Sequence, residues 1–171
     1  FRRALAAHPR VKATLKGRSD AEVMEALGRA GEHPEGRFFP DTFRFSDGTT
    51  DLEILQLAYR QMARELEAAW AARRPDLPIK SAYEALILAS IVEKETALPS
   101  ERPLVAGVYA TRLRRGMRLQ SDPTVIYGIG ASYDGDIRSR DLQTDTPYNT
   151  YLRAGLPPTP IALPGRDALR A

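Results

Sequence analysis

Residues 81–96 read SAYEALILASIVEKET, and this stretch decides how the rest of the chain can fold. Ser81, followed three residues later by Glu84, forms a capping box and predicts the start of a helix. The run that follows is almost wholly apolar until it reaches two carboxylates, Glu93 and Glu95. Charged groups are rarely placed against buried apolar surface, because removing them from water is costly. We therefore expect a helix that carries a functional carboxylate near its end.

Helical spacing alone gives little reason to choose between Glu93 and Glu95 as the functional carboxylate. Glu95 follows three apolar residues at helical spacings, namely Leu88, Ile91 and Val92. Burial on that face and the negative end of the helix dipole both favour the protonated carboxylic acid that a general acid requires. Glu93 has smaller residues at the matching spacings. The alternative is that one or both glutamates form ordinary ion pairs, with Arg102, Arg112 or Lys94 as partners.

The composition excludes several kinds of site. The 171 residues include no cysteine, which rules out disulfides and thiolate metal sites, and 43% of them are apolar, as in a globular protein. His8 and His33 are the only histidines, which argues against a Ser-His-Asp triad, and we expect no metal site. The net charge of +3 is typical of a solvated surface, so we expect no nucleic-acid partner.

Helix-start signals dominate the rest of the chain. Capping boxes at Ser19 and Thr50 predict two helices, the second reaching about Arg73. Asp122 before a proline predicts an N-cap. Residues 37–46 hold four of the five phenylalanines and predict one or two short strands or an extended loop. The fold class is therefore mainly α with a small β element (α+β).

Five ordered motifs resemble the endolytic murein transglycosylase family, also called MltG or YceG-like. They are EGRFFPDT at 35–42, ASIVEKET at 89–96 with ER at 101–102, GMRLQSDPTVIYG at 116–128, TPYNTY at 146–151 and GLPPTPI at 155–161. Residues 1–34 are compositionally plainer than the rest, and we expect them to be a helical appendage. The resemblance predicts a catalytic domain at 35–171 with a lysozyme-like helical active-site region. Residues 165–171 read as an unfinished helix, so we expect the catalytic domain to be C-terminally incomplete.

The resemblance implies an activity. It predicts a lytic transglycosylase, a carbon–oxygen lyase acting on polysaccharide. Such an enzyme cleaves the β-1,4 bond between N-acetylmuramic acid and N-acetylglucosamine within peptidoglycan glycan strands, leaves 1,6-anhydro ends, and terminates or trims nascent strands. It uses no cofactor. The expected partners are glycan strands and peptidoglycan synthases. The expected location is the periplasmic side of the bacterial inner membrane, through a single-pass N-terminal anchor that lies outside this chain.

The resemblance also assigns residues. Lytic transglycosylases commonly place the catalytic glutamate directly before Ser or Thr at a helix end. That pattern selects Glu95, followed by Thr96, as the general acid, and leaves Glu93 as an ion-pair partner. The residues expected to bind substrate are Thr96, Gln120, Asp122, Tyr148, Asn149 and Tyr151. Asp122 can instead cap a helix, and Tyr151 can instead pack in the core.

Two other functions remain open from the sequence. A true hydrolase of the same glycan needs a second carboxylate, for which Asp122 and Asp41 are the candidates. A non-catalytic glycan-binding module of a cell-wall synthesis complex would need no acid at all. The type of chain end in the products distinguishes a hydrolase from a transglycosylase. Replacing Glu95 distinguishes a glycan-binding module from both enzymes, because only an enzyme would lose cleavage.

Overall fold

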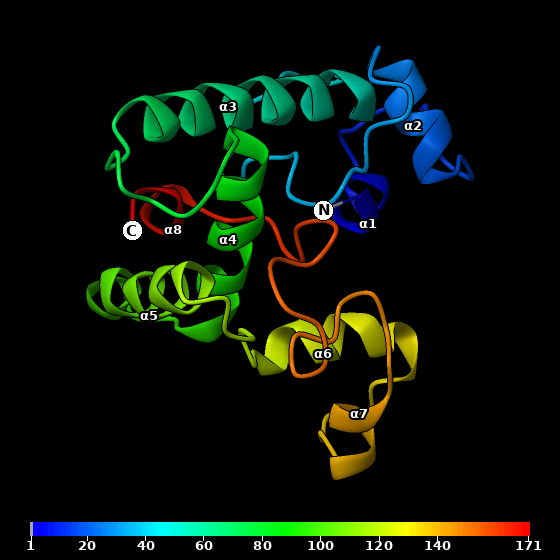
Figure 1. Cartoon of the computed structure of the whole chain (residues 1–171). Helices are drawn as coiled ribbons and strands as arrows, with labels where there is room; N and C mark the ends of the chain where they lie inside the picture. The colour runs from blue at the N-terminus through cyan, green and yellow to red at the C-terminus, as the bar shows by residue number, and fades with distance from the viewer. Residues whose placement is uncertain (1) are drawn as a thin grey trace.

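The protein is mainly helical in the computed structural model, which describes residues 2–171 (Figure 1). Residue 1 of the appendage predicted at 1–34 therefore lies outside the described residues, and the division at residue 34 stays a prediction. The α-helices are α1 (Arg2–Ala7), α2 (Asp20–Ala26), α3 (Asp51–Ala71), α4 (Ala82–Glu95), α5 (Arg102–Arg114), α6 (Asp122–Ile129), α7 (Ser139–Gln143) and α8 (Arg166–Arg170). Two short 3-10 helices are η1 (Pro99–Glu101) and η2 (Gly130–Ser132).

Helix α4 lies at the centre of the arrangement. All seven residues from Leu86 to Val92 are buried, so the helix is enclosed on every side. Its neighbours are α3, α5, α6 and α8, which come from widely separated parts of the chain. In Figure 1, α3 lies across one end of α4, and α5 and α6 lie near the other end. The end of α4 that bears Glu95 is therefore where α5 and α6 meet.

The helix starts follow the sequence closely. Ser19 and Thr50 form the complete capping boxes that the sequence predicts. Ser81 caps α4, but the Glu84 carboxylate accepts a hydrogen bond from the backbone N–H of Lys80 instead of closing the box on Ser81. Helix α3 ends at Ala71, two residues before the predicted end.

The small β element expected at residues 37–46 is not found among the described residues. This segment is the extended loop that the sequence offered as the alternative. The backbone N–H of Phe39 donates to the carbonyl of Ala58 in α3, 3.0 Å away, so the loop bonds to a helix and not to a neighbouring strand. Its phenylalanines Phe38 and Phe39 are buried against helices. Within residues 2–171, the one β-type pairing is an isolated bridge between Lys12 and Thr50.

A buried carboxylate fastens the N-terminal segment to α3. Asp51 is only 5% exposed. Its oxygens accept hydrogen bonds from the backbone N–H groups of Thr14, Leu15 and Leu52, and from the Thr14 hydroxyl. Burial alone would raise the pKa of Asp51, but these hydrogen bonds outweigh it and hold the pKa below its usual value. The ionised carboxylate is therefore part of the folded structure.

We predict that Asp51→Asn destabilises the fold. The amide would turn an N–H donor toward another N–H donor, and an unsatisfied buried group costs about 1–3 kcal/mol. Urea unfolding at pH 7 measures the loss. Because the folded-state pKa is lowered, the wild type itself loses this stabilisation as the pH falls below about 4, so the gap between wild type and variant narrows there.

Asp47→Asn is the matched control for that experiment. Asp47 is exposed and makes only a 3.6 Å ion pair with exposed Arg10, so its replacement should change the free energy of unfolding by less than about 0.5 kcal/mol. Equal losses in the two variants would contradict the role assigned to Asp51.

Candidate active site

Glu95 is the last residue of α4, and its side chain is exposed. The sequence placed it on the buried face of the helix, and that prediction of burial is wrong. Ile91 and Val92, one turn earlier, are fully enclosed, but the core ends within that turn. Thr96 then takes an extended backbone conformation and ends the helix. A carboxylate therefore stands in contact with solvent at the rim of the most buried helix in the chain.

Two hydroxyl groups hold one oxygen of Glu95. The phenol of Tyr109, from α5, and the hydroxyl of Ser121, which precedes α6, both donate to Glu95 Oε1 at 2.5 Å. No hydrogen bond within residues 2–171 reaches Oε2. Burial, followed by the bond to Glu95, raises the pKa of the Tyr109 phenol far above its ordinary value, so this group remains a donor. The carboxylate is fixed through one oxygen, and its other oxygen has no hydrogen-bond partner among the described residues.

Glu93 has a different environment. Its Oε1 accepts from Arg102 Nη2 at 2.9 Å, and its Oε2 accepts from the backbone N–H of Gly165, also at 2.9 Å. The side chain of Glu93 is 24% exposed and that of Arg102 is 11% exposed. The ion pair predicted for this glutamate is confirmed. With both oxygens occupied, Glu93 joins α4 to α5 and to the residue before α8.

Thr96 closes the loop that follows Glu95. Its hydroxyl donates to the Glu101 carboxylate at 2.6 Å and accepts the backbone N–H of Leu98 at 3.0 Å. The side chain is buried. The hydroxyl expected to contact substrate is therefore engaged within the protein, where it fixes the exit of the chain from α4.

The loop before α6 is bound to a second loop through Thr150. The backbone N–H of Gln120 donates to the Thr150 carbonyl, and that of Ser121 donates to the Thr150 hydroxyl, each at 3.0 Å. Gln120 has a φ of 53°, a left-handed conformation that no other non-glycine residue adopts in the described chain. Such a backbone is costly and persists only where the surroundings hold it. Here it leaves the Gln120 side chain exposed, next to the residue that contacts Glu95.

Asp122 does not cap α6, contrary to the prediction. Ser121 occupies the cap position, and Asp122 and Pro123 are the first two helical residues. The freed Asp122 carboxylate accepts the Tyr151 hydroxyl at 2.5 Å. That bond, followed by burial and the charges of Asp122 and Glu95, raises the pKa of Tyr151 to about 12. Asp122 directly follows Ser121, which donates to Glu95, so the Asp122–Tyr151 pair is joined to the same loop. Glu95, Tyr109, Ser121, Asp122 and Tyr151 are called the Glu95 cluster below.

The polar side-chain groups of Tyr148 and Asn149 are bonded within the protein and not to Glu95. The Tyr148 ring is tilted against Tyr127 with centroids 4.7 Å apart, and its hydroxyl bonds to that of Thr159 at 2.8 Å. Asn149 is buried, and its amide N–H groups donate to backbone carbonyls at the end of α7. Its oxygen accepts the N–H of Tyr151 at 2.9 Å. Asn149 therefore holds the loop that presents Tyr151.

Sequence reasoning missed Tyr109, Ser121 and Thr150. Ser121 and Thr150 lie inside two of the quoted motifs, so their position was the available signal. Tyr109 lies in α5, outside the motifs, and only the packing of α5 on α4 brings it to Glu95.

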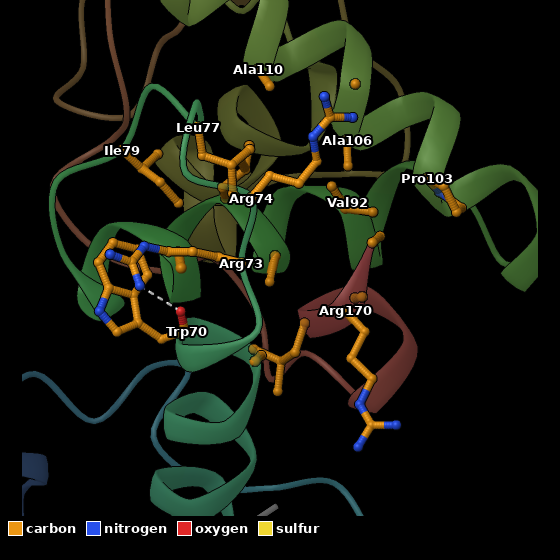
Figure 2. Close-up of a pocket in the computed structure, with 18 of the residues that line it drawn as sticks. Trp70, Arg73, Arg74, Leu77, Ile79, Val92, Pro103, Ala106, Ala110 and Arg170 are labelled. Atoms are coloured by element: carbon orange, nitrogen blue, oxygen red, sulfur yellow. Dashed lines mark hydrogen bonds between the residues drawn. The ribbon is translucent and has the colours of Figure 1, made fainter.

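A pocket between the helices does not involve the Glu95 cluster. It measures about 790 Å³ and lies between α3, α4, α5 and α8 (Figure 2). Apolar side chains such as Leu77, Ile79 and Val92 line it, and the Arg73 guanidinium lies 3.8 Å from the Trp70 ring centre at its edge. No residue predicted to bind substrate lines this pocket. Residues 2–171 also contain no cluster of acidic or histidine side chains suited to a metal ion.

Known proteins resemble this chain along most of its length. The YceG-like family profile matches residues 3–171. An endolytic murein transglycosylase of Bacillus subtilis is 37% identical over 154 residues, which are 89% of this chain and 42% of that protein. One of Streptococcus pneumoniae is 33% identical over 142 residues, 80% of this chain and 25% of that protein. The crystal structure of a yceG-like protein from Listeria monocytogenes superposes with a TM-score of 0.67 at 29% identity, covering 87% of this chain and 52% of that one.

We predict that Asp122→Asn lowers the pKa of Tyr151 from about 12 toward the ordinary value of 10.0. Removing an anionic acceptor makes the tyrosinate easier to form, so the shift is downward. NMR titration of 13C-labelled tyrosine rings measures it. The titration of Tyr59, whose acceptor is Glu32, serves as the internal control and should not move. An unchanged Tyr151 would refute the contact with Asp122.

Proposed function

Because this chain belongs to the YceG-like family, we propose that it is a murein transglycosylase whose general acid is Glu95. Two curated relatives carry the name endolytic murein transglycosylase. The chain spans less than half the length of either of them, so the activity of the whole protein is part of the proposal. The observation that carries the proposal is the state of Glu95. Its Oε1 accepts hydrogen bonds from two hydroxyls, whereas Oε2, at an exposed helix end, has no hydrogen-bond partner within residues 2–171.

In the first step, Glu95 Oε2 donates its proton to the oxygen of the bond between N-acetylmuramic acid and N-acetylglucosamine. The bond between that oxygen and C1 of the muramic residue breaks, and the N-acetylglucosamine portion leaves with a hydroxyl group. Positive charge develops at C1. The 2-acetamido group of the same sugar can stabilise that charge, so the step requires no second protein carboxylate.

In the second step, the C6 hydroxyl oxygen of the muramic residue bonds to C1, and its proton returns to Glu95 Oε2. The products are a 1,6-anhydro end and a regenerated acid, with no water consumed. A hydroxyl on the same sugar has a high effective concentration at C1, which favours ring closure over attack by water. The reaction is thus that of a carbon–oxygen lyase.

We place Gln120 and Tyr151 at the substrate. The Gln120 amide is exposed on a strained backbone beside Ser121, and amide groups suit the acetamido groups of the glycan. Tyr151 belongs to the same cluster, and its half-buried ring can contact a sugar while its hydroxyl is bonded to Asp122. Asp122 orients Tyr151 in this proposal. Three other residues have a structural role in this proposal, since their polar side-chain atoms are already bonded within the protein: Thr96, Tyr148 and Asn149.

The cellular setting belongs to the proposal as well. Peptidoglycan glycan strands would be the substrate, peptidoglycan synthases the protein partners, and the outer face of the bacterial inner membrane the location. None of the helices in residues 2–171 combines the length and apolar character required to cross a membrane. The lysozyme-like character of the active-site region likewise stays a prediction.

One observation favours a second candidate function, a hydrolase of the same glycan. Asp122 lies in the Glu95 cluster, as a second carboxylate of a hydrolase must. Asp41, the other candidate, is exposed, and the hydrogen bond that its carboxylate accepts in the described chain comes from the adjacent Thr42 and not from a member of the Glu95 cluster. Mass spectrometry of muropeptides decides between the two reactions, because a hydrolase leaves reducing ends where a lyase leaves 1,6-anhydro ends.

We predict that Glu95→Gln abolishes glycan cleavage by the intact natural protein, lowering the rate at least about 1,000-fold. The amide retains the shape of the side chain but cannot donate a proton to the leaving oxygen. Release of muropeptides from purified peptidoglycan, followed by mass spectrometry, measures the loss. Cleavage by the Glu95→Gln variant would remove Glu95 from the mechanism. An inactive wild type would instead favour a glycan-binding module.

Glu93→Gln is the control, two residues away on the same helix. It loses the ion pair with Arg102, so its unfolding temperature should fall. Its folded form should still cleave, because Glu93 has no free oxygen to serve the substrate. If the two variants lost cleavage equally, the distinction between the glutamates would be wrong.

A further inference from the structure

We infer that Tyr109 and Ser121 are positioning residues that decide which oxygen of Glu95 carries the transferable proton. This inference rests on the proposed function, since it describes how the same acid is held. Both side chains reach the carboxylate from elements other than α4: Tyr109 from the middle of α5 and Ser121 from the cap of α6. They converge on a single atom, Glu95 Oε1, at 2.5 Å each.

Convergence on one oxygen breaks the symmetry of the carboxylic acid. A protonated carboxyl has one O–H, and its hydrogen can reside on either oxygen. Oε1 has two lone-pair sites, and the two hydroxyl groups occupy both of them. The hydrogen of the carboxylic acid therefore resides on Oε2. Oε2 has no hydrogen-bond partner in the described chain and belongs to an exposed side chain. The proton is thus held on the oxygen that a glycan can reach.

Both donors are themselves held in place. Ser121 is buried, and its backbone is bonded on both sides: its N–H donates to the Thr150 hydroxyl, and its carbonyl accepts from the Thr124 hydroxyl at 2.7 Å. Thr124 and Thr150 are bonded to each other at 2.8 Å. Tyr109 is buried among the residues that pack α5 on α4. Neither donor can follow Glu95 if the carboxylate rotates, so rotation costs two hydrogen bonds.

The same arrangement serves both steps of the proposed reaction. In the first step it aims the O–H of Oε2 at the glycosidic oxygen. After the proton leaves, the two donors stabilise the resulting carboxylate, because hydrogen bonds to ionised groups are the stronger ones. Oε2 then remains in place to receive the C6 hydroxyl proton. A carboxylate that could turn away at this point would leave C1 open to water.

The test uses two variants that remove one hydroxyl each, Tyr109→Phe and Ser121→Ala, in the intact natural protein. Each should lower kcat about tenfold, because each loses one hydrogen bond to a charged group. KM should not change, because neither residue is proposed to contact the glycan. The fraction of reducing ends among the products should rise relative to 1,6-anhydro ends. A merely structural role would not change that ratio.

Tyr59→Phe is the matched control. Its phenol also donates to a carboxylate, that of Glu32 at 2.8 Å, but it lies on α3 and touches no member of the Glu95 cluster. It should retain wild-type kcat and product ratio. Thermal unfolding of all three variants shows whether each remains folded at the assay temperature.

The outcomes separate this inference from the proposed function. If the wild type cleaves, Glu95→Gln does not, and both hydroxyl variants match the wild type, the positioning role is overturned and the proposed function stands. A change confined to KM, or an unchanged product ratio alongside a lower kcat, also overturns it. Cleavage by Glu95→Gln, or an inactive wild type, overturns the proposed function itself.

Discussion

The burial of α4 is the constraint on which the rest of the structure depends. A helix whose residues 86–92 are all buried cannot lie on a surface, so the chain must return to it from several directions. Helices α3, α5, α6 and α8 do so, and all four contact α4. The enclosure ends one turn before the helix does. Three charged residues, Glu93, Lys94 and Glu95, directly follow the enclosed part of the helix, and the candidate site lies where the enclosure ends.

The site is assembled from loops that fix one another. Thr150 accepts hydrogen bonds from the backbone N–H groups of Gln120 and Ser121. The same residue therefore holds the strained backbone of Gln120 and fixes the position of Ser121 beside Glu95. Asn149 in turn sets the place of Tyr151. Residues more than twenty positions apart thus meet without any strand to align them. Precision in this helical protein comes from buried side-chain hydrogen bonds.

Much of the fold could be predicted because its signals are local. The capping boxes at Ser19 and Thr50 and the helical class depend on residues a few positions apart, and the ion pair of Glu93 needed only a nearby arginine. The exposure of Glu95 could not be predicted, because periodicity describes a helix face and not the point where its cover ends. The contact with Tyr109 could not be predicted either, since it depends on how α5 crosses α4.

Residues 161–165, the segment before α8, are hydrogen-bonded to α4 in a way that affects how the protein unfolds locally. The N–H of Ile161 donates to the Ser90 hydroxyl, and the N–H of Gly165 donates to Glu93, so side chains of α4 hold this segment where strand pairing would in a sheet. Its amides are therefore sheltered by the innermost helix. In native-state hydrogen exchange, segment 161–165 would open together with α4 as one cooperative unit, although it looks like a surface loop.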